Sequence, residues 1–341
     1  MKISTMNRQI ILKSRPEGLP VPAGFEINEA VVSPLQDGEL RVKSRFISVD
    51  PYMRGRMSEA KSYIPPFEVG KPLNGGVVAE VIESRNPGFV PGDAVLGHLL
   101  WQEIQNVDAL TVKKIDAGAA PLSYYLGILG MPGLTAYFGL LDIGKPVAGE
   151  TVVVSGAAGA VGMVVCQIAR MKGCRVIGIA GSDEKTTYLK DMLKLDEVLN
   201  YRNEKDMESA IARACPNGVD VYFDNVGGEI ADGVIRNINK GARIVLCGQI
   251  SLYNSVEVPT GPRLQPLLLK KSALMQGFIV SNYASRFDEG IQQLAQWLGD
   301  GKLTCQETII QGFESLPEAF IGLFHGRNTG KLLVETNTPA A

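Results

Sequence analysis

The sequence predicts a two-domain α/β protein, in which a doubly wound parallel sheet is joined to a smaller β-rich domain. Three observations support this fold class. The length of 341 residues suits two domains better than one. Residues 39–122 consist of short apolar runs between Pro-Gly turns, whereas β-branched runs alternate with helical segments after residue 121. A glycine-rich segment also joins one of those later runs to a helix.

Composition restricts the classes of partner and the compartment. Hydrophobic residues make up 45% and charged residues 21% of the chain, as in ordinary globular proteins. The formal net charge is −2, so the chain lacks the positive field that binds nucleic acid. Its five cysteines include no C-x-x-C pair, which is typical of free thiols in a reducing compartment. Because the sequence has no visible signal peptide or membrane span, we predict a cytoplasmic protein.

The β-rich domain has strand-like runs, such as residues 76–82, followed by turn signals such as Asn86-Pro87-Gly88. This pattern is typical of a partly barrel-like domain. Two further strand-like runs flank a predicted helix beyond residue 301, and we expect this tail to return to the β-rich domain. The predicted domains are therefore 1–125, completed by 301–341, and 126–300.

The second domain contains four β-branched runs between helical segments. Their continuous apolar character is typical of parallel strands that are buried on both faces. The runs are 151–154, 175–179, 219–223 and 242–246.

A dinucleotide site is predicted directly after the first of these strands. The segment Ser155 to Gly162 carries glycines at positions 156, 159 and 162 and leads into a helix with apolar residues at helical spacing. Glycines allow the tight turn and the close backbone approach that a pyrophosphate at a helix N-terminus needs. A glycine-rich turn without a ligand is the alternative, and the strand before and the helix after favour the site.

The end of the next strand indicates which dinucleotide binds. An NAD site usually has an acidic residue there, whereas this strand ends in Gly181-Ser182, followed by Asp183-Glu184-Lys185. Small residues leave room for a 2′-phosphate, to which Ser182 can donate and Lys185 supplies charge. NADP is therefore favoured, although Asp183 weakens this interpretation. Ser182 or Asp183 can also cap the helix, with Lys185 as a solvated charge.

Metal-dependent and nucleophilic chemistry lack the residues that they need. No cysteine precedes Cys166, and the two histidines, His98 and His325, lie far apart in the sequence. A catalytic zinc would need three protein ligands, so we predict no metal site. The chain has no G-x-S-x-G motif, and Cys166 is interpreted as a small core residue within a helix.

Several motifs together resemble the zinc-independent medium-chain reductases, and within them the leukotriene B4 12-hydroxydehydrogenase/prostaglandin reductase group, with its curcumin and alkenal double-bond reductases. The resemblance extends from Arg8 to Glu335. It is carried by residues 49–57, 155–162, 181–185, 200–201, 222–228, 247–254 and 330–331.

This resemblance implies a Rossmann domain that binds NADP(H), a GroES-like substrate domain and a set of cofactor contacts. Without the resemblance, residues 278–280 would be interpreted equally well as an ordinary buried strand. The full set of expected cofactor contacts, which includes the glycines, Ser182 and Lys185 named above, is Gly156, Gly159, Ala160, Val161, Gly162, Ser182, Lys185, Tyr201, Asn225, Cys247, Gly248, Ile250, Ser251, Tyr253, Phe278, Ile279, Val280 and Asn328.

Without a metal or a nucleophile, the cofactor must supply the chemistry and the protein must orient it. Hydride addition to the β-carbon of an enone or enal spreads charge into an enolate, which a few hydrogen bonds can stabilise. Tyr253 is the preferred phenol for this task, although it could merely pack on the cofactor. Tyr52 and Met131 are the expected substrate contacts, on the strength of the resemblance. The prediction is an NADPH-dependent enone and enal reductase; a quinone reductase and a non-catalytic NADPH-binding protein remain alternatives.

The resemblance also implies a homodimer, since two cofactor domains pair through their sheet edges in the family. The strand-like segment Leu274 to Val280 is the candidate edge, because an exposed apolar edge needs a partner.

Overall fold

The computed structural model describes residues 6–336, so the predictions that concern residues 1–5 and 337–341 lie outside the described part. The chain divides into two compact units. The antiparallel unit comprises Met1–Leu126, Thr308–Arg327 and Leu332–Ala341, and the parallel unit comprises Gly127–Glu307 and Asn328–Lys331.

A seven-stranded sheet and a two-stranded sheet form the framework of the antiparallel unit. The order in the large sheet is β14-β15-β3-β4-β5-β7, with β6 paired to β3, and the small sheet pairs β1 with β2. Side chains of β3 alternate between buried and less buried positions, as expected for a strand with one face on a core. The strands are β1 (Met6–Leu12), β2 (Phe25–Val31), β3 (Glu39–Ser48), β4 (Asn74–Ser84), β5 (Ala94–Leu100), β6 (Ile104–Asp108), β7 (Val112–Ile115), β14 (Glu307–Gln311) and β15 (Lys331–Glu335).

The tail joins this sheet through β15, in which Leu333 pairs with Ser48 of β3. Helix α9 (Leu316–Phe324) packs its Phe320 into the same core as Trp101, while α1 (Met53–Arg56) is a single turn. The contact division places residues 301–307 and 328–331 with the parallel unit. The folding domains 1–125 with 301–341, and 126–300, therefore stay a prediction.

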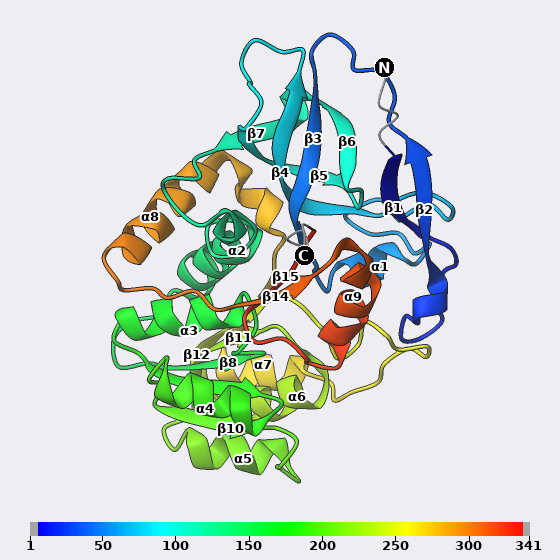
Figure 1. Ribbon diagram of the computed structural model, residues 1–341. Coiled ribbons are helices and arrows are strands. Elements are labelled where there is room, and N and C mark those ends of the chain that lie inside the picture. The colour runs from blue at the N-terminus through cyan, green and yellow to red at the C-terminus, as the bar shows by residue number, and fades with distance from the viewer. Residues whose placement is uncertain (1–5, 337–341) are drawn as a thin grey trace. The chain divides into compact units, whose positions relative to one another are not determined.

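Six parallel strands form the sheet of the parallel unit, which confirms the predicted doubly wound arrangement (Figure 1). Every residue of β8 is buried, because helices cover both faces of the sheet. The strands, in spatial order, are β10 (Glu197–Asn200), β9 (Arg175–Ala180), β8 (Thr151–Ser155), β11 (Val219–Asp224), β12 (Ile238–Leu246) and β13 (Leu274–Gly277).

Helices that follow successive strands cover the two faces. Helices α5, α6 and α7 share one hydrophobic core with a face of the sheet, through residues such as Ile211, Val234 and Leu268. Helices α3 and α4 contact β8, β9 and β10. The helices are α2 (Met131–Phe138), α3 (Gly162–Met171), α4 (Asp183–Asp191), α5 (Met207–Ala214), α6 (Gly228–Arg236), α7 (Gln265–Lys271) and α8 (Phe287–Gly299), and a π-helical segment, η4 (Gly139–Gly144), follows α2.

The predicted strand from Leu274 to Val280 is wrong in its second half. Strand β13 ends at Gly277, and a 3-10 segment occupies Val280–Arg286. The ring of Phe278 packs instead on Tyr283, with ring centroids 6.3 Å apart. It also lies over Gly139, where an added Cβ would approach the Phe278 ring to 2.6 Å. Packing on η4 therefore replaces strand pairing after Gly277.

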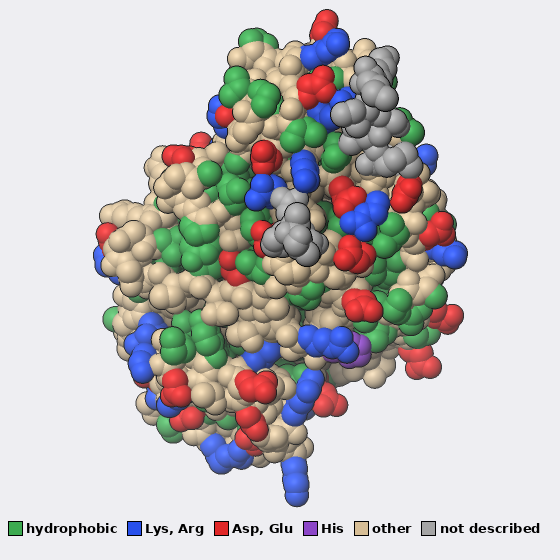
Figure 2. Space-filling model, in the orientation of Figure 1, with side chains coloured by type: hydrophobic (Ala, Val, Ile, Leu, Met, Phe, Trp, Pro, Cys, Tyr) green, Lys and Arg blue, Asp and Glu red, His purple; other side chains and the backbone are tan. Residues whose placement is uncertain are grey.

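The surface and the helices agree with the composition. Lys and Arg side chains are interspersed with Asp and Glu over the face shown in Figure 2, and the two kinds are nearly equal in number, 34 against 36 in the whole sequence. Within residues 6–336, no helix has the length and apolar character needed to cross a membrane.

Candidate cofactor and active site

The glycine loop between β8 and α3 has the backbone geometry that the motif predicts. Gly156 has φ +58°, a conformation that side chains rarely adopt. The amide of Gly159 donates to the carbonyl of Gly156 over 2.9 Å, which closes the turn. A Cβ on Gly162 would lie 2.3 Å from the Gly156 oxygen, so only glycine fits there. The loop thus leads tightly into the N-terminus of α3, the positive end of the helix dipole, where an anion can bind.

A segment from the tail packs on this loop. The amide of Gly330 donates to the carbonyl of Ala158 over 2.8 Å, and Gly330 forms a β-bridge with Gly159. The Nδ2 of Asn328 donates to the Gly330 carbonyl over 2.8 Å, which holds the segment in its turn. The structure therefore brings Asn328 and the glycine loop together within the parallel unit, although they are far apart in sequence.

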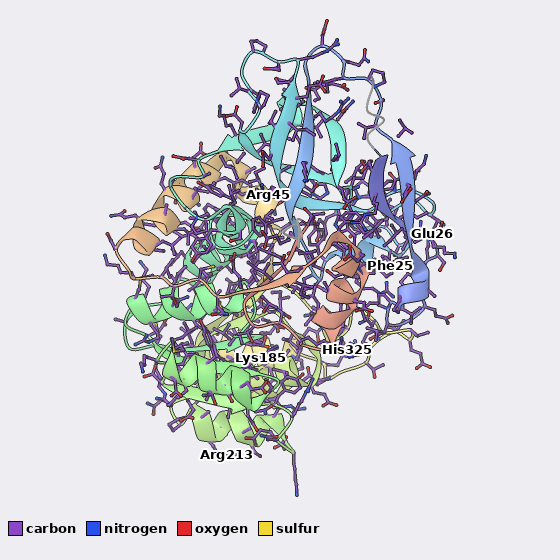
Figure 3. The ribbon with its side chains drawn as sticks, viewed as in Figure 1. Phe25, Glu26, Arg45, Lys185, Arg213 and His325 are labelled. Carbon is purple, nitrogen blue, oxygen red and sulfur yellow. The ribbon has the colours of Figure 1, made fainter. Side chains whose placement is uncertain are left out.

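The turn from β9 into α4 combines a helix cap with positive charge. Ser182 is the N-cap, and its Oγ accepts a hydrogen bond from the Lys185 amide over 3.3 Å. Lys185, labelled in Figure 3, lies in the first turn of α4. Burial lowers the pKa of Lys185, and the neighbouring charge of Arg202 lowers it further. A second cation, Arg202, therefore lies near this turn, with its guanidinium 5.9 Å from the centre of the Tyr201 ring. Arg202 was missed by the sequence analysis, and its only signal was its position next to Tyr201.

The structure accounts for Asp183, the residue that weakened the NADP interpretation. Its Oδ1 accepts hydrogen bonds from Nδ2 of Asn200, over 2.7 Å, and from Nδ2 of Asn203, over 3.1 Å. This oxygen is thus engaged by the last residue of β10 and by the loop that follows the strand. The ring of Tyr201 lies against Gly181, where an added Cβ would meet it at 2.8 Å. A larger residue at position 181 would displace that ring.

The loops after β11 and β12 are joined at the same, carboxyl edge of the sheet. Asn225 donates from Nδ2 to the carbonyl of Ser155 over 2.8 Å. The amides of Cys247 and Gly248 donate to the carbonyl of Asp224, and Ser251 Oγ donates to that of Val226 over 2.6 Å. Ile250 donates its amide to the Asn225 carbonyl. The predicted contacts in these two loops thus lie on one connected surface beside the glycine loop.

Tyr253, in the loop after β12, has a protonated phenol. Its oxygen accepts a hydrogen bond from the Gln249 amide over 3.2 Å, which leaves the hydroxyl hydrogen available for donation. Burial raises the pKa of Tyr253 above its usual value. Burial also raises the pKa of the neighbouring Cys247 thiol to about 12. Both groups are therefore neutral near pH 7, and only the phenol is a good hydrogen-bond donor.

The remaining predicted residues lie in two different places. Phe278, Ile279 and Val280 are half-buried after β13, and Met131 starts α2 with 37% of its surface exposed, all within the parallel unit. Tyr52 belongs to the antiparallel unit, directly before α1. Burial, and then the charge of Asp50, raise the pKa of Tyr52, so its phenol also stays protonated.

The two histidines and Cys166 have contacts typical of structural residues. His98 Nε2 lies 2.7 Å from Asn74 Oδ1. Partial burial lowers the pKa of His98, and the charge of Arg56 lowers it further. His325 caps the end of α9, and Cys166 is fully buried in α3. Residues 6–336 contain no group of three or more His, Cys, Asp or Glu side chains able to hold a metal ion.

Two family models match the two parts of the chain. Residues 8–115 match the N-terminal domain of oxidoreductase, and residues 160–296 match the zinc-binding dehydrogenase domain. An NADPH-dependent curcumin reductase of Escherichia coli (strain K12) is 43% identical over 333 residues, covering 96% of both chains. The chain belongs to the zinc-independent medium-chain dehydrogenases/reductases. Its resemblance to this group in the sequence is thereby confirmed.

Other relatives of this medium-chain reductase agree over its whole length. A putative NADP-dependent oxidoreductase, YfmJ, of Bacillus subtilis (strain 168) is 55% identical and covers 99% of this chain and 100% of its own. The structure of CurA from Vibrio vulnificus in complex with NADPH superposes with a TM-score of 0.92 at 44% identity, covering 97% of this chain and 100% of CurA. A quinone oxidoreductase of Pseudomonas syringae, at 20% identity and a TM-score of 0.73, shares the fold alone.

Proposed function

We propose that this chain reduces the carbon–carbon double bond of α,β-unsaturated ketones and aldehydes with NADPH. As a medium-chain reductase of this group it is an NADP-dependent oxidoreductase acting on CH-CH groups. The proposed substrate class is inferred from the protonated phenol of Tyr253, in the loop after β12 on the same edge of the sheet as the glycine loop. A single neutral donor suits the diffuse charge of an enolate better than the concentrated charge of an alkoxide.

The proposed cofactor contacts follow the carboxyl edge of the parallel sheet. Gly156 and residues 159–162 hold the pyrophosphate, while Ser182, Lys185 and Tyr201, with Arg202 beside them, hold the 2′-phosphate. Asn225, residues 247–253, residues 278–280 and Asn328 surround the nicotinamide. When bound there, NADPH supplies the hydride.

The protein's own contribution to the reaction is orientation and one hydrogen bond. Tyr253 donates to the enolate oxygen, directly or through a ribose hydroxyl, and the bond strengthens as charge develops. Tyr52 and Met131 contact the substrate, with the Tyr52 hydroxyl as a neutral donor. Because the hydrogen bond of Tyr253 stabilises an enolate, the substrate must offer a carbonyl conjugated to its double bond.

Isotope labelling tests the proposal. With NADPH deuterated at both C4 positions and a simple enone, deuterium is expected at the β-carbon, with solvent hydrogen at the α-carbon and the carbonyl intact. Deuterium at the carbonyl carbon, giving an allylic alcohol, would refute double-bond reduction. Oxidation of NADPH by quinones but not by enones or enals would indicate the quinone reductase instead. Tight NADPH binding without turnover on any of these acceptors would indicate a non-catalytic protein.

The proposal extends to a cytoplasmic homodimer. Strand β13 is an edge of the parallel sheet, and its Leu274 is 46% exposed. An exposed apolar edge favours pairing with the same edge of a second copy. Light scattering at micromolar concentration is expected to give the dimer mass, and a monomer mass would count against it.

A further inference from the structure

Two aspartates stand at opposite ends of strand β11, and each binds the neighbouring strand β8. At the amino end, Asp220 Oδ2 accepts a hydrogen bond from the Thr151 amide over 2.8 Å, and its Oδ1 accepts one from Asn239 over 2.8 Å. At the carboxyl end, Asp224 is fully buried. Ligands of parallel sheets bind at the carboxyl ends of the strands, so the two positions differ in their distance from the proposed site.

The side chain of Asp224 collects donors from several segments on one oxygen. Its Oδ1 accepts from Ser155 Oγ at 2.9 Å, Tyr222 OH at 2.7 Å, the Val226 amide at 3.0 Å and the Gly227 amide at 2.9 Å. Its Oδ2 is also buried and, within residues 6–336, has no hydrogen-bond partner. Burying a carboxylate is costly, and several donors on one oxygen offset that cost.

Three of the four donors, Ser155, Val226 and Gly227, lie at two parts of the proposed cofactor surface, whereas Tyr222 is buried in the core. Ser155 directly precedes the glycine loop, and its Oγ in turn accepts the Asn225 amide over 3.0 Å. At the turn after β11, Gly227 and Gly228 have φ values of +74° and +59°, which glycine adopts readily, and the amides of Val226 and Gly227 donate to Asp224. The backbone oxygen of Asp224 accepts the amides that open the loop after β12.

We infer that Asp224 is a positioning residue: its carboxylate holds the glycine loop and the turn after β11 in one arrangement, and its backbone oxygen holds the start of the loop of Tyr253. It acts through Ser155, Val226 and Gly227 and does not itself touch the cofactor. An amide in its place would keep one oxygen for these four donors, but it would bury two N–H groups at the position of Oδ2, where residues 6–336 offer no hydrogen-bond partner. The inference rests on the proposed NADPH site.

The test compares Asp224→Asn with Asp220→Asn, the same change at the other end of the strand. NADPH is titrated into each full-length protein and followed by the fluorescence of the bound nicotinamide, with Tm measured alongside. Asp224→Asn is expected to raise the Kd for NADPH about tenfold or more and to lower kcat, with a smaller change in KM for the enone. Asp220→Asn is expected to lower Tm while leaving the Kd within about twofold.

The outcomes separate this inference from the proposed function. A folded Asp224→Asn protein with unchanged Kd for NADPH would overturn the positioning role, while leaving the site intact. Wild-type protein that fails to bind NADPH would overturn the proposed function and the inference with it. If Asp224→Asn does not fold, Tyr222→Phe removes one donor at nearly constant volume. A rise of about threefold in Kd would then support the inference, and an unchanged Kd would overturn it.

Discussion

The two units differ in how their sequence relates to their chemistry. In the parallel unit, the functional motifs follow the strands directly, because all six strands end at one edge of the sheet and their loops meet there. In the antiparallel unit, neighbouring strands run in opposite directions, so loops occur at both ends. Tyr52 is connected to function there only through the family. A motif thus identifies a site in a parallel sheet more directly than in an antiparallel one.

The largest expected contrast comes from adding one methyl group in each unit. Gly162→Ala places a Cβ against backbone atoms of the glycine loop and is expected to weaken NADPH binding by about a hundredfold or more. Gly55→Ala in α1 meets nothing within 4 Å. It is expected to change the free energy of unfolding by less than about 0.5 kcal/mol. NADPH titration and urea unfolding measure both effects, and equal tolerance of the two changes would contradict the geometry of the loop.

The charge at the turn after β9 should act on one cofactor only. Lys185→Ala is expected to raise KM for NADPH about ten- to a hundredfold and to leave KM for NADH unchanged, because it removes a charged contact to phosphate. Lys190→Ala is the control, since Lys190 lies on the same helix and donates to the Asp196 carbonyl. Steady-state kinetics measure KM for NADPH and for NADH in both variants. An equal rise in KM for NADH would contradict the role of Lys185 at the 2′-phosphate.

A change at Tyr253 should act on turnover. Tyr253→Phe is expected to lower kcat about tenfold with little change in KM for the enone, since an enolate contact strengthens only in the transition state. Burial raises the pKa of Tyr253, so wild-type kcat should stay constant through neutral pH and fall only at alkaline pH, where the phenol loses its proton. The Phe variant should lack that fall. Unaltered kcat in the variant would refute the role of this tyrosine.

The corresponding change in the antiparallel unit should act on substrate binding. Tyr52→Phe is expected to raise KM for the enone about two- to tenfold through the loss of one neutral hydrogen bond, with Kd for NADPH unchanged. Kinetics with a fixed enone and a separate NADPH titration measure the two quantities. A fall in kcat without a change in KM would contradict the proposal that Tyr52 contributes to substrate binding and Tyr253 to turnover.

The smallest expected effect is that of metal removal. Dialysis against a chelator should leave kcat unchanged in this zinc-independent enzyme, and metal analysis of the purified protein should find no stoichiometric zinc. Loss of activity that zinc alone restores would contradict this expectation.

Local patterns in the sequence were sufficient for the main features of the parallel unit. Continuous β-branched runs predicted its buried strands, and the glycine spacing predicted the loop before α3. Both signals are local, since the apolar character of a run and the clash of a Cβ at Gly162 with Gly156 depend on residues close in the chain. Ser182 as a helix cap followed from the same kind of local signal.

Only the tertiary structure decided which distant groups meet. The engagement of Asp183 by Asn200 and Asn203, the approach of Arg202 to Lys185, and the packing of Gly330 on the glycine loop all join separate segments. The end of β13 at Gly277 was set by the packing of Phe278 on η4. Hydrophobic periodicity reports whether a residue is buried but not what it is buried against, so contacts between loops of different strands required the folded chain.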